Sequence, residues 1–209
     1  MTSAERSAPH SGLRLTACRE ERSLPRIMNG PSIGFLETSS IARGIEATDA
    51  MMKTANVELL MTLIVPRGKY LIMIGGMVAD VESSMAAGRE VAGDSVIDHF
   101  LIQNAHPQLP AAIKGRVKVD AVEAAGILAT KEVASAIYAG DAAAKAAGVT
   151  LIEARNQPGA KGMVVLTGDV GAVRAAVAAG VATIKKEGML VSQVVIPRAH
   201  EALARSLMG

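Results

Sequence analysis

The residue types that carry most enzyme chemistry are few in this chain, and their spacing forms no recognised catalytic set. The 209 residues include one Cys and four His. A single Cys excludes an intramolecular disulfide and a cysteine-rich zinc or iron–sulfur site within one chain. Asp98-His99 is an adjacent pair with no nucleophile nearby, and P-loop, GxGxxG and HExxH motifs are absent from the sequence. We therefore expect no catalytic residues, no metal, no cofactor and no enzymatic activity.

Composition narrows the class of protein further. The net charge is +2, and only 20% of the residues are charged, which does not suit a nucleic-acid partner. The apolar stretches are shorter than the ~20 residues that span a bilayer, and there is no secretory signal pattern. We expect a cytoplasmic protein that contacts neither membrane nor nucleic acid. Residues 1–30 are rich in Ser, Pro and charge without periodicity, and they predict a flexible N-terminal extension.

The rest of the chain is a long internal repeat. At an offset of 92 residues the two halves match over some seventy positions, and after a two-residue slip the match continues to the end. The matched pairs include Gly34/Gly126, Thr38/Thr130, Ile45/Ile137, Asp49/Asp141, Lys53/Lys145, Gly76/Gly168 and His106/His200. The repeat predicts a first domain at 31–110, a linker at 111–121 and a second domain at 122–209.

Each half has the same order of predicted elements. In the first half, strands are predicted at 31–37, 57–65, 69–74 and 96–103. Helices are predicted from a Thr38/Ser39 cap to about 55, with Ile41, Ile45 and Met52 on one face, and at 77–90. The second half has a helix after Asp169 with a stripe of Val and Ile, closed by Gly188. The fold class is therefore α+β, with two tandem ferredoxin-like β-α-β-β-α-β domains, each an antiparallel sheet with helices packed on it.

Four segments carry a family resemblance. IGFLET (33–38), DAMMK (49–53), GDVGAV (168–173) and VIPRAH (195–200) resemble, in this order, the bacterial microcompartment (BMC) shell domain. The copies look non-permuted, and two in one chain resemble the tandem shell proteins, which form trimers shaped as pseudohexagonal tiles. The resemblance implies a single-layer homotrimer in the microcompartment shell, with other shell proteins at its edges and encapsulated enzymes as further partners. It also implies a central pore that passes small metabolites passively.

In the family, the hairpin turn after the second strand of each domain faces the pore. The corresponding residues here are Val65, Pro66, Arg67 and Gly68 in the first domain and Gln157, Pro158, Gly159 and Ala160 in the second. Both sequences are also ordinary hairpin turns. Three inward-pointing Arg67 side chains would favour anionic or polar metabolites. Some tandem shell proteins hold an iron–sulfur cluster through a Cys in this turn, but here the one Cys, Cys18, lies in the extension.

The resemblance also places residues at the tile edge. Lys53 and Lys145 are expected to meet their counterparts on a neighbouring tile, although a cation at a helix C-terminus is favourable by itself. Arg198 matches the edge Arg of the family, whereas the first domain has Asn104 there. His106 and His200 follow the last strand of each domain, where edge packing or helix capping is expected rather than metal binding.

Two other functions stay open at this stage. A ferredoxin-like oligomeric regulatory module could bind a small ligand between its domains, because this fold carries many functions. An enzyme would need converging acid, base or nucleophilic groups, and the sequence offers none that we can name.

Overall fold

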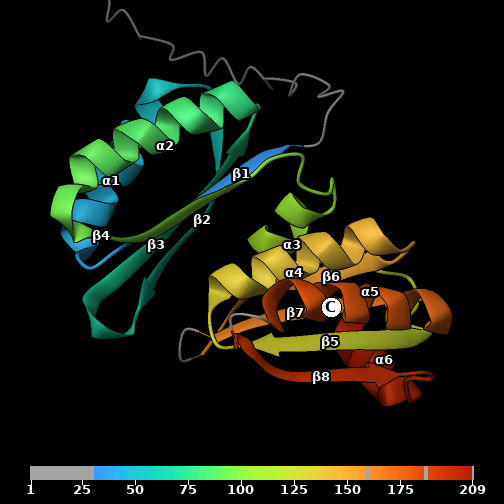
Figure 1. The fold of residues 1–209 in the computed structure, drawn as a ribbon. Helices are drawn as coiled ribbons and strands as arrows, with labels where there is room; N and C mark the ends of the chain where they lie inside the picture. Colours follow the sequence, from blue (N-terminus) through green and yellow to red (C-terminus); the bar gives the residue numbers. More distant parts are fainter. Residues whose placement is uncertain (1–30, 159–160, 186–187, 209) are drawn as a thin grey trace, which may run out of the picture.

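The computed structural model describes residues 31–158, 161–185 and 188–208, and it has two domains joined through a short helical connection (Figure 1). The predicted flexible extension, residues 1–30 with Cys18, lies outside the described residues. The first domain contains β1 (Ser32–Thr38), α1 (Ile41–Thr54), β2 (Val57–Val65), β3 (Lys69–Gly76), α2 (Val78–Ala92) and β4 (Val96–Ile102), followed by α3 (Leu109–Lys114). The second contains β5 (Ala124–Thr130), α4 (Val133–Ala146), β6 (Thr150–Gln157), β7 (Lys161–Gly168), α5 (Val170–Lys185), β8 (Leu190–Ile196) and α6 (Glu201–Met208).

The two sheets have the same topology. Their strand orders are β2-β3-β1-β4 and β6-β7-β5-β8, and every neighbouring pair is antiparallel. Even the irregularities repeat, because β2 and β6 each carry a register shift at the same place, after Leu59 and Leu151. The structure therefore confirms the predicted α+β class and the two ferredoxin-like domains.

The helix ends follow local capping chemistry. The predicted cap of α1, Thr38/Ser39, is wrong by one residue, since Ser40 Oγ accepts a hydrogen bond from the Arg43 N–H at 3.4 Å. At the start of α5, Asp169 Oδ1 accepts from the Gly171 N–H at 2.8 Å, as a capping Asp should. Gly188 adopts a positive φ of 65° and donates its N–H to Lys185 O, which ends the helix as predicted.

Each sheet is covered on both faces, but by different elements. In the first domain α1 and α2 pack on one face of the sheet, where Met51 of α1 shares a core with Leu36 and Ile72 of the strands. The opposite face, with Phe35 and Met73, belongs to a core shared with α3 and the second domain. In the second domain α4 and α5 cover one face and α6 covers the other (Figure 1). One continuous core therefore joins the two domains.

Two of the three residues of the stripe predicted on α1 face away from its own sheet, whereas the third, Ile41, is partly buried against the core of that sheet. The buried residues of α1 are Gly44, Ala47 and Met51, whereas Ile45 is 53% and Met52 37% exposed. A Cβ atom at Gly44 would lie 2.5 Å from Tyr70 Cδ1, so the small residue lets α1 approach the sheet closely. Ile45 and Met52 are therefore left for another surface.

Two short helices, α3 and α6, were not predicted. Each follows the last strand of its domain, and α3 includes the start of the predicted linker, residues 111–114. Lys114 Nζ contacts Glu58 Oε1 of β2 by an ion pair, and the Val117 N–H donates to Ile152 O of β6 at 2.8 Å. The connection between the domains is thus fastened to both sheets.

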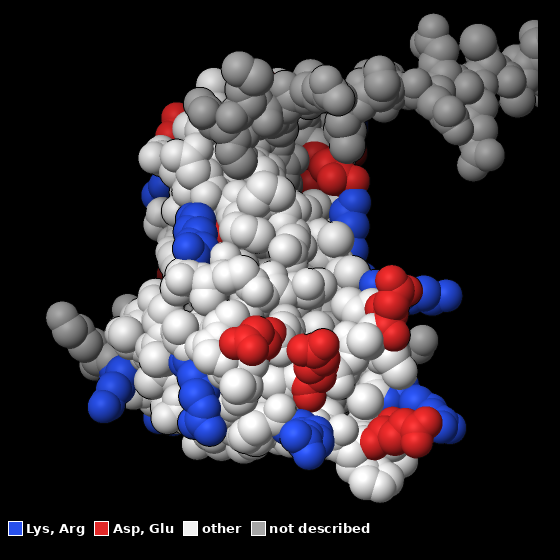
Figure 2. Space-filling view, turned by 90° about the vertical axis from the view of Figure 1, so that its right-hand side faces the viewer, with Lys and Arg blue, Asp and Glu red and all other residues white. Residues whose placement is uncertain are grey.

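The surface of the described residues is mixed in charge. Lys and Arg are interspersed with Asp and Glu over the face in Figure 2, with broad uncharged areas between them. Among the described residues, none of the helices has the length and hydropathy needed to cross a bilayer.

Candidate pore and tile-edge residues

The first predicted pore turn is a tight turn, Pro66–Gly68, between β2 and β3. Arg67 and Gly68 have positive φ values of 68° and 72°. The left-handed conformation is unfavourable for a residue with a Cβ, so the hairpin holds the Arg67 backbone in place. Pro66, Arg67 and Gly68 are exposed, but Val65 is only 6% exposed and packs into the shared core. The chain therefore presents Arg67 as the charged group of this turn.

The second predicted pore turn begins with Gln157 and Pro158; Gly159 and Ala160 lie outside the described residues. The strands that lead into the two turns, β2 and β6, both end toward the left of Figure 1. Gln157 is not free, because its Nε2 donates a hydrogen bond to Glu153 Oε1 at 3.1 Å. The Gln157 side chain is thus held along β6.

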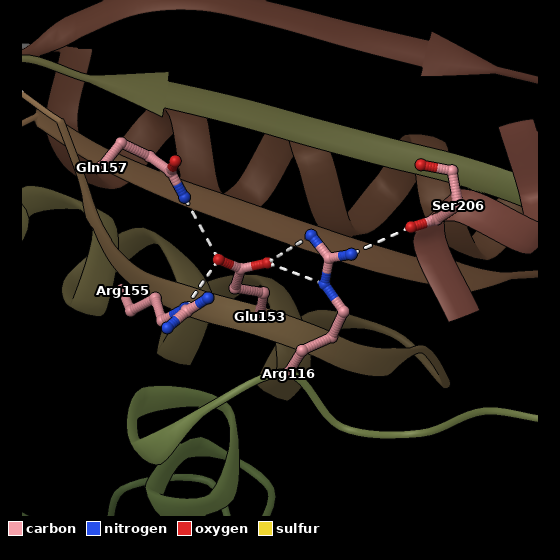
Figure 3. A network of polar contacts seen from close by, with 5 residues as sticks. All are labelled: Arg116, Glu153, Arg155, Gln157 and Ser206. Atoms are coloured by element: carbon pink, nitrogen blue, oxygen red, sulfur yellow. Dashed lines mark hydrogen bonds and ion pairs between the residues drawn. The ribbon is translucent and has the colours of Figure 1, made fainter. Parts of the chain in front are cut away.

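Glu153 is the centre of a polar network that the sequence did not reveal (Figure 3). Its carboxylate is 1% exposed and accepts from Arg155 Nε at 2.7 Å and from Arg116 Nη2 at 3.1 Å. Arg116 also donates to Ser206 O of α6 at 2.9 Å. A buried carboxylate needs such partners, and here they fasten the connection, β6 and α6 to one another. The first domain has Met61 and Leu63 at the positions of Glu153 and Arg155.

The predicted edge lysines each pair with an acid one turn earlier on their own helix. Lys53 Nζ lies 2.5 Å from Asp49 Oδ2, and both side chains are well exposed. Lys145 Nζ lies 2.6 Å from Asp141 Oδ2, but the Asp141 side chain is only 10% exposed. The second carboxylate is buried because its other oxygen accepts the His106 N–H of the first domain at 2.7 Å. Equivalent residues thus stand in different surroundings in the two domains.

The other predicted edge residues lie around the ends of β4 and β8. Asn104 is exposed with φ 51°, whereas the exposed Arg198 is in the ordinary, negative-φ region. His106 Nδ1 accepts from the Gln108 N–H at 3.4 Å, and His200 Nδ1 accepts from the Ala202 N–H at 3.2 Å. His200 therefore caps the first turn of α6, whereas the bond of His106 reaches Gln108, the residue just before α3. The described residues contain no group of three or more His, Cys, Asp or Glu that could hold a metal.

The junction between the domains is a second feature that sequence reasoning missed. Phe100 stacks between Phe35 of its own domain and Tyr138 of α4, with ring centroids 4.6 and 4.5 Å apart. Gln108 bridges to the edge of the second sheet, accepting from the Leu151 N–H at 2.7 Å and donating to Val149 O at 3.2 Å. Three of the few aromatic residues of the chain lie at this one contact. The scarcity of aromatic residues in the sequence was the signal that could have pointed to them.

Comparison with known proteins decides the family. The sequence profile described as the BMC domain matches residues 32–105 and 124–199. The chain belongs to the BMC-domain family. The resemblance read from the sequence is therefore confirmed, with two BMC domains in one chain.

Individual BMC relatives agree with this assignment. The chain is 41% identical to the bacterial microcompartment shell protein PduT of Citrobacter freundii, over 85% of this chain and 97% of that protein. It is 33% identical to the carboxysome shell protein CcmK2 of Synechococcus elongatus over 82 residues, 37% of this chain and 80% of that one. The crystal structure of a microcompartment protein from Desulfitobacterium hafniense is similar at 48% identity with a TM-score of 0.80, covering 83% of this chain and 98% of the other.

Proposed function

We propose that the protein is a structural subunit of a bacterial microcompartment shell. Three chains close into a pseudohexagonal ring, the rings tile into the shell, and a central pore passes small metabolites. The BMC-domain family supports the shell role. The ring is supported by a single observation. Residues that are exposed on one domain have equivalents in the repeat that are buried on the other domain, because the contact between the two domains of the chain covers them.

The α1–β2 face of the first domain is one half of this comparison. Its apolar residues Ile45, Met52 and Leu59 are 53%, 37% and 38% exposed. Their equivalents in the second domain, Ile137, Ala144 and Leu151, are 0%, 5% and 0% exposed. The second set is covered because the first domain packs against it. The first set therefore forms an exposed apolar face, equivalent to the face of the second domain that the first domain covers.

The opposite side of the second domain supplies the other half. Leu203 and Val194 are 39% and 47% exposed, whereas their equivalents Leu109 and Phe100 are packed in the shared core. A second copy of the chain can thus place its Leu203 surface on Leu59 of the first, repeating between chains the contact made inside each chain. Such a head-to-tail contact is heterologous, so it produces a ring when the rotation closes.

Polar groups follow the same pairing. Inside the chain, Asp141 accepts the His106 N–H. The equivalent pair is Asp49, whose carboxylate is 62% exposed, and His200, which is exposed. In the ring, Asp49 of one chain accepts the His200 N–H of the next. Lys53, bound to Asp49, then lies at the ring border beside this contact, as expected for a tile-edge lysine.

The same ring puts the two hairpin turns of every chain around its axis. Arg67 supplies a positive charge three times, and the second turn contributes Gln157 and Pro158 without charge. Such a pore has threefold symmetry and favours anionic or polar metabolites. Arg198 lies at the border of the tile, where other shell proteins and further copies make contact; encapsulated enzymes are the remaining partners.

The test compares two exposed apolar residues of the second domain. Leu203→Asp puts a charge into the proposed contact. Val191→Asp puts one at a residue that is 50% exposed and whose equivalent, Ile97, is also exposed, at 43%. The wild-type chain and Val191→Asp should have a native mass three times 21.6 kDa and form sheets in negative-stain images. Leu203→Asp should be a folded monomer by circular dichroism and native mass. A wild-type monomer, or a trimer of Leu203→Asp, would contradict the ring.

A further inference from the structure

A cavity opens beside the first hairpin turn, between the two domains. Its volume is about 360 Å³. The first domain contributes residues of β1 and of the hairpin, including Glu37, Arg67 and Lys69, and the second contributes the start of α4 with Lys131 and Glu132. The cavity therefore exists within one chain.

Some of the charged side chains that line the cavity form ion pairs and others do not. Lys69 Nζ lies 3.0 Å from Glu37 Oε1, and this pair neutralises itself. Arg67, Lys131 and Glu132 form no ion pair with any described residue. Two cations against one carboxylate leave an excess positive charge. Arg67 and Lys131 approach the cavity from different domains, so an anion between them would contact both.

Much of the remaining wall is apolar. Phe35, Leu71 and Val133 line it together with Val65, Pro66 and Ala134. Inorganic phosphate would leave this surface without a partner, whereas an organic anion with a short hydrocarbon body would cover it. We infer that the cavity binds a short-chain organic carboxylate, with the carboxylate between Arg67 and Lys131 and the hydrocarbon body against the apolar wall.

The repeat does not duplicate the charged residues of this site. In the repeat, Glu37, Lys131 and Glu132 correspond to Ala129, Ser39 and Ser40. The equivalent space between neighbouring chains would therefore lack most of these charges. Binding needs only one chain, but the site's position beside a pore rests on the proposed function. In the ring, three such sites would raise the local concentration of a carboxylate next to the pore turn.

The experiment titrates the full chain with butyrate, followed by saturation-transfer NMR and calorimetry, with inorganic phosphate as a separate titrant. We expect one butyrate per chain with a dissociation constant on the order of 1 mM. Arg67→Gln and Lys131→Gln should each weaken binding at least tenfold. Lys161→Gln is the control, because it removes the cation that corresponds to Lys69 in the second domain and does not line the cavity. The trimer-breaking variant Leu203→Asp should bind butyrate as well as the wild type does.

Each contrary result has a distinct meaning. No saturable butyrate binding, or an equal loss in Lys161→Gln, would overturn the site. Phosphate binding as tight as butyrate binding would overturn the organic carboxylate as its ligand. Binding that persists in Leu203→Asp, while the wild type proves monomeric, would retain the site and refute only the ring.

Discussion

The proposed ring can be tightened at a position where the two domains differ. Inside the chain, Gln108 makes two hydrogen bonds to the edge of β6. The equivalent residue on the second domain is Ala202, which cannot make them. The edge it would face in the next chain is β2, at the Leu59 N–H and the Val57 carbonyl. The local backbone is the same there, because Val57 and Val149 both donate to the carbonyl two residues earlier. We therefore predict that Ala202→Gln stabilises the trimer.

The magnitude follows from the two bonds and the cost of ordering the new side chain. Two hydrogen bonds contribute roughly 1–3 kcal/mol, and fixing a Gln side chain costs up to about 1.5–2 kcal/mol. With both hydrogen bonds at the upper end of that range, because the contact shields them from water, a net gain of about 1 kcal/mol per contact is expected. Releasing one chain from a closed ring breaks two contacts, so the gain is about 2 kcal/mol, or roughly a 30-fold lower dissociation constant.

Dilution followed by native mass spectrometry or sedimentation velocity measures this constant directly. The matched control is Ala202→Met, which has a similar length and no amide. If Met and Gln tighten the trimer equally, the gain comes from apolar contact and the hydrogen-bond argument is wrong. If Ala202→Gln weakens the trimer or leaves it unchanged, Ala202 does not face the β2 edge of a neighbouring chain.

Four further predictions concern residues whose positions are described above. Asp49→Ala should leave the monomer's unfolding free energy within about 0.5 kcal/mol, because the bond that its carboxylate makes within the described residues is an exposed ion pair, but it should loosen the trimer. Asp141→Ala should instead cost about 1–3 kcal/mol in urea unfolding, since it leaves a backbone N–H of the first domain without its acceptor. Glu153→Gln should cost about 1–3 kcal/mol by the same measurement, because it removes the charge that two arginines share, and an unchanged midpoint would contradict the structural role of the network. Replacing Lys53 and Lys145 with Ala should preserve the trimer's mass but reduce sheet formation in negative-stain images, and undiminished sheets would refute their place at the tile edge.

Much of the fold was predictable because local signals agree with the global one. The repeat, the hairpin turns and the order of strands and helices could all be read from the sequence. The helices α3 and α6 could not, because segments of six and eight residues carry too little periodicity, and α3 contains Pro110. Their stability comes from packing, with Leu109 and Ala204 buried. Short helices that depend on tertiary contacts are poorly marked by propensity.

The site residues show a second limit. An apolar stripe on a helix predicts burial but does not say against what, so the exposure of Ile45 and Met52 could not be foreseen. The burial of Asp141 was equally hidden, because its partner lies in the other domain. Asp49 and Asp141 occupy the same position in the repeat, so their sequence patterns are the same. Only the structure shows that the Asp141 side chain is buried and the Asp49 side chain is exposed.

The duplication also explains why the two kinds of junction differ in chemistry. Within the chain, Tyr138 stacks on Phe100 and Gln108 binds the sheet edge. Between chains the equivalent residues are Glu46, Val194 and Ala202, which can form neither the aromatic stack nor the side-chain hydrogen bonds. Two covalently joined domains meet at a high effective concentration, so the junction within the chain forms first. The weaker contact between chains then joins folded chains into the ring. The ring should therefore dissociate at a lower denaturant concentration than the one that separates the domains. If the trimer mass and the contact between the domains were lost in a single transition, the junction within the chain and the contact between chains would be equally strong.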